Sequence, residues 1–189
     1  MGTSNMSMAE SLRSSDRFTG AAVVMGVASC GKTTIGQAIA ERLVARFIEG
    51  DKLHAPESVA KMSAGIPLTD ADRWPWLTRI GEALQGGDGA IAACSALKAS
   101  YRTAIARAAG RPVSFIHLHG SRELLARRIA LRKGHFMPAT LLDSQLATLE
   151  APGTDEIALT LDIAEAPKQI VGRAAAWLTS TAVRRDWLP

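Results

Sequence analysis

The stretch Gly26-Val27-Ala28-Ser29-Cys30-Gly31-Lys32-Thr33 decides the fold, because it matches the phosphate-binding pattern G-x-x-x-x-G-K-[ST] at every fixed position. The apolar run Ala21–Met25 before it predicts a buried strand, and Ile35 and Ile39 after it stand at the four-residue step of a helix. A strand, a tight loop and a helix N-terminus in this order direct backbone N–H groups and the positive helix end toward an anion. An ordinary glycine-rich turn, the alternative, leaves both flanks unexplained.

The loop residues have distinct predicted roles. We expect the segment Gly26–Thr34 to hold the phosphates of a nucleotide. Lys32 offers a mobile positive charge to the β- and γ-phosphates, and the Thr33 hydroxyl suits Mg²⁺. Cys30 is either a small filler residue or, if its pKa is lowered, a thiol that is sensitive to oxidation.

Composition limits the class of protein. The 189 residues are 47% hydrophobic, which predicts one packed domain over residues 21–189. Residues 1–20 are rich in Ser and Met and lack an apolar segment, so we expect a flexible leader and no signal peptide. No run approaches the ~18 apolar residues of a membrane span.

Charge and cysteine content narrow the class further. The 22 Lys and Arg only slightly outnumber the 18 Asp and Glu, and there is no basic face rich in aromatic residues, so no nucleic-acid partner is expected. The two cysteines cannot form a disulfide framework, which favours the reducing cytoplasm.

Short apolar runs alternate with helical patterns along the chain, which predicts an α/β fold with a parallel sheet between two helix layers. The expected strands are Ala21–Met25, Arg46–Glu49, Ala90–Cys94, Val113–His117 and Ala158–Ile163. The expected helices are Lys32–Ala45, Pro56–Ala64, Asp72–Leu84, Lys98–Ala109, Ser121–Arg132, Ala139–Leu149 and Pro167–Thr179. Thr69 and Asp72 resemble a capping box, and Pro75 is expected in the first turn of the helix that follows.

A pair of carboxylates ends the second expected strand. Glu49 and Asp51 point to the same side of that strand, at the sheet edge where ligands collect. We expect this edge to lie beside the phosphate loop on the neighbouring strand, with Glu49 supporting Mg²⁺ and Asp51 orienting an acceptor hydroxyl. The alternative is a solvated turn at the strand end.

Three cationic or titratable residues, His54, Lys61 and Arg73, follow among Met, Pro and Trp residues. Such a segment suits a small, hydroxylated, anionic acceptor, whose carboxylate would satisfy charges that a neutral sugar leaves unpaired. Singly, each residue also fits a loop or surface position. Ser95, at the carboxyl end of the third expected strand, is a further ligand candidate or a buried polar cap.

Arg128 and Arg132 stand four apart on one expected helix face, where like charges repel unless an anion lies between them. An arginine-bearing lid over residues 122–140 would neutralise the transferring phosphoryl group and exclude water. A solvated basic helix end is the alternative. His117 and His119 lack a third ligand, so we assign them no metal.

Specific blocks go beyond a generic phosphate loop and resemble the gluconokinase family, small phosphate-loop kinases related to shikimate kinases. The matching blocks are Gly26–Thr34, Glu49–His54, Lys61–Leu77, Ala93–Lys98, Tyr101-Arg102, Arg132-Lys133-Gly134-His135-Phe136, Gln145 and Leu149-Glu150-Ala151-Pro152. Together they cover roughly residues 21–163 of the chain.

The resemblance implies transfer of a phosphoryl group from ATP, with Mg²⁺, to the 6-hydroxyl of D-gluconate. It also implies a nucleoside-monophosphate-kinase-like three-layer fold with a five-stranded parallel sheet and a mobile lid, a cytoplasmic location and a homodimer. Carried over residue by residue, Asp51 would orient the acceptor hydroxyl. The gluconate pocket would be lined by His54, Lys61, Arg73, Ser95 and His135, and the lid would carry Arg128 and Arg132.

Three positions in two segments depart from the family pattern. The family commonly has glycine where Ser29 stands and serine where Cys30 stands, and its Asp-Gly-Asp turn reads Glu49-Gly50-Asp51 here. The rival readings are a shikimate kinase-like or nucleoside monophosphate kinase, and a nucleotide-binding regulator without phosphotransfer. Such regulators usually carry an N/T-K-x-D element, which this sequence lacks.

Overall fold

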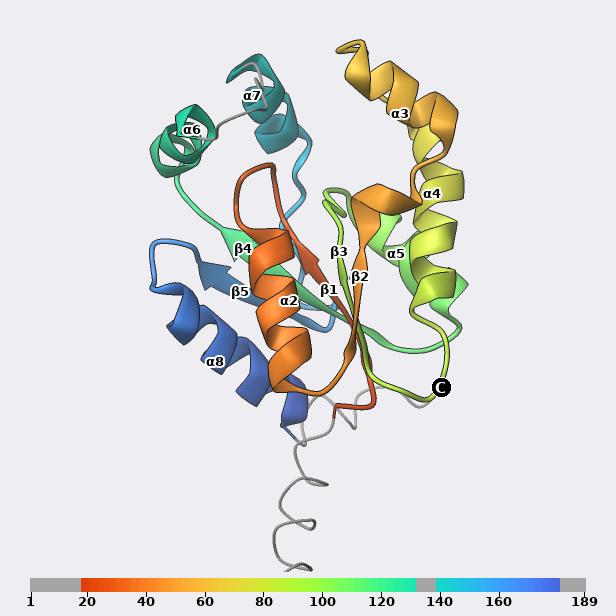
Figure 1. The fold of residues 1–189 in the computed structure, drawn as a ribbon, viewed down its shortest axis with the longest axis vertical. Helices are drawn as coiled ribbons and strands as arrows, with labels where there is room; N and C mark the ends of the chain where they lie inside the picture. The colour runs from red at the N-terminus through yellow and green to blue at the C-terminus, as the bar shows by residue number, and fades with distance from the viewer. Residues whose placement is uncertain (1–17, 132–138, 181–189) are drawn as a thin grey trace, which may run out of the picture.

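The sheet and its strand order set the geometry of everything that follows. The computed structural model describes residues 18–131 and 139–180. Its five strands are all parallel and lie in the order β2-β3-β1-β4-β5 (Figure 1). They are β1 (Ala21–Met25), β2 (Arg46–Glu49), β3 (Ala90–Ala93), β4 (Val113–His119) and β5 (Ala158–Asp162).

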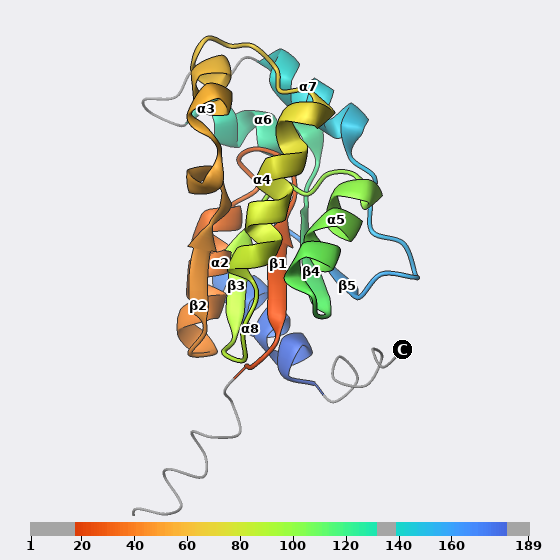
Figure 2. The ribbon, with the colours of Figure 1, turned by 90° about the vertical axis from the view of Figure 1, so that its right-hand side faces the viewer.

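Helices cover both faces of this sheet, as the alternating pattern predicts. They are α2 (Lys32–Arg42), α3 (Pro56–Ser63), α4 (Asp70–Ala83), α5 (Ala99–Ala109), α6 (Arg122–Ala130), α7 (Ala139–Thr148) and α8 (Pro167–Thr179), with a short 3₁₀ turn, η1 (Gly50–Leu53). Figures 1 and 2 show α2 and α8 on one face and α4 and α5 on the other, while α3, α6 and α7 stand beyond the carboxyl ends of the strands.

Alternation along β1 explains why the core has two halves. Ala22 and Val24 pack with α2 and α8, whereas Ala21, Val23 and Met25 pack with α4 and α5. All five side chains of β1 are buried, because a central parallel strand is covered on both faces. The predicted three-layer α/β fold is confirmed.

The strand order corrects one expectation about the site. We expected β2, which leads to Glu49, to neighbour the strand that carries the phosphate loop, but β3 lies between them. The chain leaves β1 through α2 on one face and leaves β3 through α5 on the other, so the topology predicts ligand binding at the carboxyl ends of β1 and β3.

Several element ends differ from the sequence prediction. The helix after the phosphate loop ends at Arg42 instead of Ala45, because Val44 takes a left-handed backbone (φ 52°) and closes the end. α4 begins at Asp70, so Pro75 lies inside the helix and not in its first turn, and the carbonyl of Ala71 loses its N–H partner. The capping box of Thr69 and Asp72 is present.

The packed part of the chain also begins earlier than the expected boundary at residue 21. Phe18 is buried, and its backbone N–H donates to the carbonyl of Leu43 at 3.3 Å. Residues 18–20 therefore belong to the domain and not to the expected leader.

Candidate active site

The phosphate loop joins β1 to α2, and its backbone explains its glycines. Gly26 (φ 139°) and Gly31 (φ 99°) have left-handed backbones, and a side chain at Gly26 would stand 2.7 Å from the Leu118 carbonyl oxygen. Ser29 has φ 62°, which accounts for the family's glycine at this position. The Ser29 hydroxyl is buried and has no hydrogen-bond partner among the described residues.

Lys32 folds back over the loop that it follows. Its ammonium donates to the carbonyl of Val27 at 2.9 Å and lies 4.0 Å from the sulfur of Cys30. Burial raises the pKa of the Cys30 thiol more than the nearby Lys32 charge lowers it. Cys30 thus behaves as a buried filler residue, and the structure gives no support to a thiolate there.

The end of β3 is the loop's direct neighbour. The Gly26 N–H donates to the Ser95 carbonyl at 3.2 Å, so Ser95 lies next to the first loop residue, as its prediction required. Burial raises the pKa of Cys94 to about 12, and the charges of Lys32 and Asp51 act on the same thiol in opposite directions. The loop that precedes Lys32 bonds to Ser95, and Gly50, the neighbour of Asp51, packs on the Ala93 carbonyl, so both segments lie at the end of β3.

The Glu49-Gly50-Asp51 turn is held at two points. Any side chain at Gly50 would clash with the carbonyl of Ala93, so the turn rests directly on β3. The indole N–H of Trp76, which is 3% exposed, donates to the Gly50 carbonyl at 2.8 Å. Glu49 is half-buried and Asp51 is exposed, which keeps Asp51 open to a ligand.

His54 follows this turn and stacks on Trp76, with ring centroids 4.2 Å apart and an interplanar angle of 13°. Burial lowers its pKa, against an opposing effect of Asp51, so the ring is neutral near pH 7. Its Nδ1 is buried and has no partner in the part of the chain that the structure describes. A hydroxyl or carboxyl group of an acceptor would satisfy this atom.

Lys61 and Arg73 each lie close to a carboxylate at the start of α4, so they are not the unpaired cations that we expected. Lys61 is 2.7 Å from Asp72, whose pKa falls to about 2 through this contact and through Thr69. Arg73 donates to the Leu68 carbonyl at 2.5 Å and lies 3.8 Å from Asp70. A neutral sugar would therefore not leave these two cations unpaired, as we expected, because both already have carboxylate neighbours.

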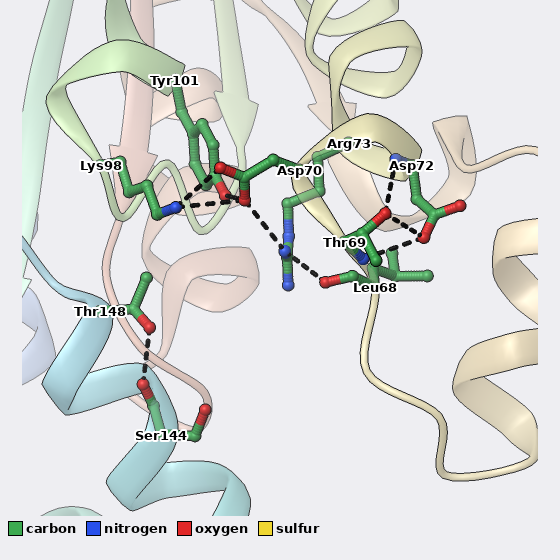
Figure 3. A network of polar contacts seen from close by, with 9 residues as sticks. All are labelled: Leu68, Thr69, Asp70, Asp72, Arg73, Lys98, Tyr101, Ser144 and Thr148. Carbon is green, nitrogen blue, oxygen red and sulfur yellow. Dashed lines mark hydrogen bonds and ion pairs between the residues drawn. The ribbon is translucent and has the colours of Figure 1, made fainter.

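Figure 3 shows a cation that sequence reasoning did not assign to the site. Lys98 lies 2.8 Å from Asp70, which also accepts from the Tyr101 hydroxyl at 2.5 Å. Both contacts lower the pKa of Asp70, with Lys98 the larger cause. The cluster thus holds three cationic side chains, Lys61, Arg73 and Lys98, against the two carboxylates. The sequence signals were that Lys98 and Tyr101 lie in two of the blocks that match the family and stand one helical turn apart.

Arg128 reaches the phosphate loop from α6. Its guanidinium donates to the Cys30 carbonyl at 3.5 Å and to the Ile163 carbonyl at 2.8 Å. The structure thus brings this predicted lid arginine to the phosphate loop. Arg132 and His135 lie outside the described residues, and the helix that we expected to reach Arg132 ends at Ala130.

The remaining questions are the setting of His117, the presence of a metal site and the presence of a membrane-spanning helix. His117 is buried beside Thr160 (Nδ1 to Oγ1 3.3 Å), and burial lowers its pKa to about 4. Residues 18–131 and 139–180 contain no group of three His, Cys, Asp or Glu side chains arranged to hold a metal ion. Over the same ranges, no helix has the length and apolar character needed to cross a bilayer.

β1, the glycine-rich loop and α2 carry a lysine that folds over the loop. Carboxylates and cations follow the ends of the neighbouring strands, and this combination is typical of a small phosphate-loop kinase. The family model described as "AAA domain" matches residues 22–152, and thus more than half of the chain. The chain belongs to the gluconokinase family. It is 54% identical to a gluconokinase from Gluconobacter oxydans over 138 residues, which are 71% of this chain and 77% of the relative.

Further relatives agree with this assignment. A probable gluconokinase from Xenopus tropicalis is 41% identical over 159 residues, covering 75% of this chain and 84% of the relative. The crystal structure of a gluconokinase from Sinorhizobium meliloti superposes with a TM-score of 0.80 at 50% identity, covering 86% of this chain and 93% of that one.

Proposed function

We propose that this chain transfers the γ-phosphoryl group of ATP to the 6-hydroxyl of D-gluconate. The observation that carries the proposal is that the phosphate loop, which precedes Lys32, and the turn that holds Asp51 both contact the end of β3, the strand that leads to the cationic cluster through Lys98. Family membership supports gluconate as the acceptor.

Charge at the start of α4 favours an acid over a neutral sugar. Lys61, Arg73 and Lys98 face two carboxylates, so the cluster has a net positive charge of one from three cations and two anions. The carboxylate of gluconate would neutralise it, whereas glucose would not. His54, with its unpartnered Nδ1, and Ser95 complete the proposed acceptor pocket, to which we also assign His135.

The donor side uses the phosphate loop. In the proposed complex Lys32 leaves the Val27 carbonyl and pairs with the β- and γ-phosphates. Arg128, already at the Cys30 carbonyl, neutralises charge on the transferring group, and we assign Arg132 to the same task from a lid over residues 122–140. Asp51 orients the acceptor hydroxyl for in-line attack.

The residues present suit a magnesium ion. Thr33 is exposed at the first turn of α2, and neither its hydroxyl nor the Glu49 carboxylate has a hydrogen-bond partner among the described residues. Such oxygen atoms are the ligands that Mg²⁺ takes in phosphoryl-transfer sites, where it neutralises phosphate charge. Because Glu49 is one methylene longer than the family's aspartate, we propose that it holds a water of the ion's hydration shell. A cytoplasmic location and a homodimer complete the proposal, on the family resemblance alone.

A coupled assay of ADP release tests the acceptor. We expect turnover with D-gluconate and a far lower kcat/KM with glucose, shikimate or AMP. Comparable values for glucose and gluconate would remove the basis of the assignment.

Two matched substitutions test the division between the carboxylates. Asp51→Asn keeps the shape and removes the charge, so kcat should fall about 100-fold or more while ADP binding persists. Glu49→Gln should instead raise the Mg²⁺ concentration needed for half-maximal rate. An unchanged kcat in the Asp51 variant, with the loss confined to Glu49→Gln, would reverse the two roles.

A further inference from the structure

Two helices that follow the fourth strand both place a side chain on the phosphate loop. Arg128 of α6 contacts the Cys30 carbonyl, and the Gln145 side chain of α7 accepts from the Ala28 N–H at 2.7 Å. α6 and α7 are joined by Arg122 and Asp143, whose two hydrogen bonds measure 2.7 and 3.0 Å. The Gln145 contact spans 117 residues of sequence, and no sequence pattern predicted it.

Gln145 and Lys32 hold the two edges of a single peptide unit. The Val27 carbonyl accepts from the Lys32 ammonium at 2.9 Å, and the N–H of the same peptide, on Ala28, donates to Gln145. A phosphate-loop lysine serves the β- and γ-phosphates. The Gln145 amide therefore lies one peptide width from the ammonium that serves those phosphates.

The hydrogen bond also determines which way the amide faces. A backbone N–H can only donate, so the Gln145 atom that meets Ala28 must be the oxygen, Oε1. The two N–H bonds of Nε2 then remain as donors, and no acceptor among residues 18–131 and 139–180 meets them. Gln145 is only half-buried, so part of its side chain is open to a ligand.

We propose that Gln145 donates from Nε2 to an oxygen of the γ-phosphoryl group, while Ala28 fixes the amide through its oxygen. The proposal rests on transfer from a nucleoside triphosphate at this loop. It does not depend on which acceptor is used. A triphosphate should gain this contact and a diphosphate should not, because only the triphosphate reaches the γ position.

A purely structural tether is the competing account of the same contact. In that case Gln145 only joins α7 to the loop, and removing it affects triphosphate and diphosphate alike. The ratio of the two affinities separates the accounts, and neither measurement needs an acceptor.

The experiment titrates ADP and the non-hydrolysable triphosphate AMP-PNP, each with Mg²⁺, into wild-type protein and three variants. Gln145→Met removes both hydrogen bonds with a side chain of similar size. Gln145→Glu keeps an acceptor for the Ala28 N–H but has no donor. Gln37→Glu is the control, because it makes the same charge change at an exposed position of α2. Thermal unfolding checks that each variant is folded.

We expect both Gln145 variants to weaken AMP-PNP by about tenfold or more while ADP stays within about twofold, the scale of one hydrogen bond to a charged group. Gln37→Glu should leave the ratio unchanged. An unchanged ratio in Gln145→Met, or an equal loss of both nucleotides, would overturn the proposal. A failure to use gluconate would refute the proposed acceptor and leave this result standing.

Discussion

Replacing Trp76 with Phe should separate acceptor positioning from nucleotide binding. The substitution keeps an aromatic ring beside His54 but removes the indole N–H that donates to the Gly50 carbonyl at 2.8 Å. The loss of this hydrogen bond costs about 1 kcal/mol of folding free energy. Because Gly50 immediately precedes Asp51, a shift of the turn also moves the acceptor carboxylate, and a displacement of about 1 Å can cost about 100-fold in rate.

The assay combines kcat for gluconate, the Kd of ADP and the free energy of unfolding in denaturant. We expect kcat to fall by about 10- to 100-fold with the ADP Kd unchanged. Trp177→Phe on α8 is the matched control, since Trp177 packs against the core half on the opposite face of the sheet, so it should cost stability and leave kcat intact. A Trp76 variant that loses stability but keeps its kcat would refute the reasoning, as would a parallel loss of ADP affinity.

Two further predictions concern stability. Val44 is 71% exposed and has φ 52°, the left-handed conformation that closes the end of α2, where the N–H of Ala45 donates to the carbonyl of Ala40. Val44→Gly should therefore raise the free energy of unfolding by about 1 kcal/mol in chemical denaturation, because glycine adopts this conformation without strain. A loss of stability would contradict this account. Arg102, 1% exposed, holds the pKa of Glu156 below its ordinary 4.5, so the pair stabilises fully above that pH and the benefit disappears as pH falls through the folded-state pKa. Glu156→Gln should therefore be less stable than wild type at pH 7 by about 1–3 kcal/mol, with the difference shrinking below about pH 4.5, and a difference that persists in acid would exclude the ion pair as its cause.

Local patterns predicted the phosphate loop, all five strands and the capping box, because each depends on neighbouring residues. Ser29 is a single-residue example, because the phosphate loop requires a left-handed backbone at this position whether the side chain is serine or glycine. The adjacency of β2 and β1 was wrong because strand order depends on which faces the connecting helices cover. Pro75 was placed wrongly because the helix begins at Asp70, directly after its Thr69 cap and two residues before the predicted start.

The sequence by itself determined the strand, the glycine-rich loop and the helix that follows it, and the run of cations after the second strand, since all of these are properties of short segments. Only the tertiary structure decided how those charges pair. Lys61 and Arg73 found carboxylates on α4, Lys98 joined them from the start of α5, and Gln145 came to the loop from 117 residues away. The physical reason is that an ion pair or hydrogen bond is set by distances of a few ångströms, which the packing of whole helices on the sheet determines.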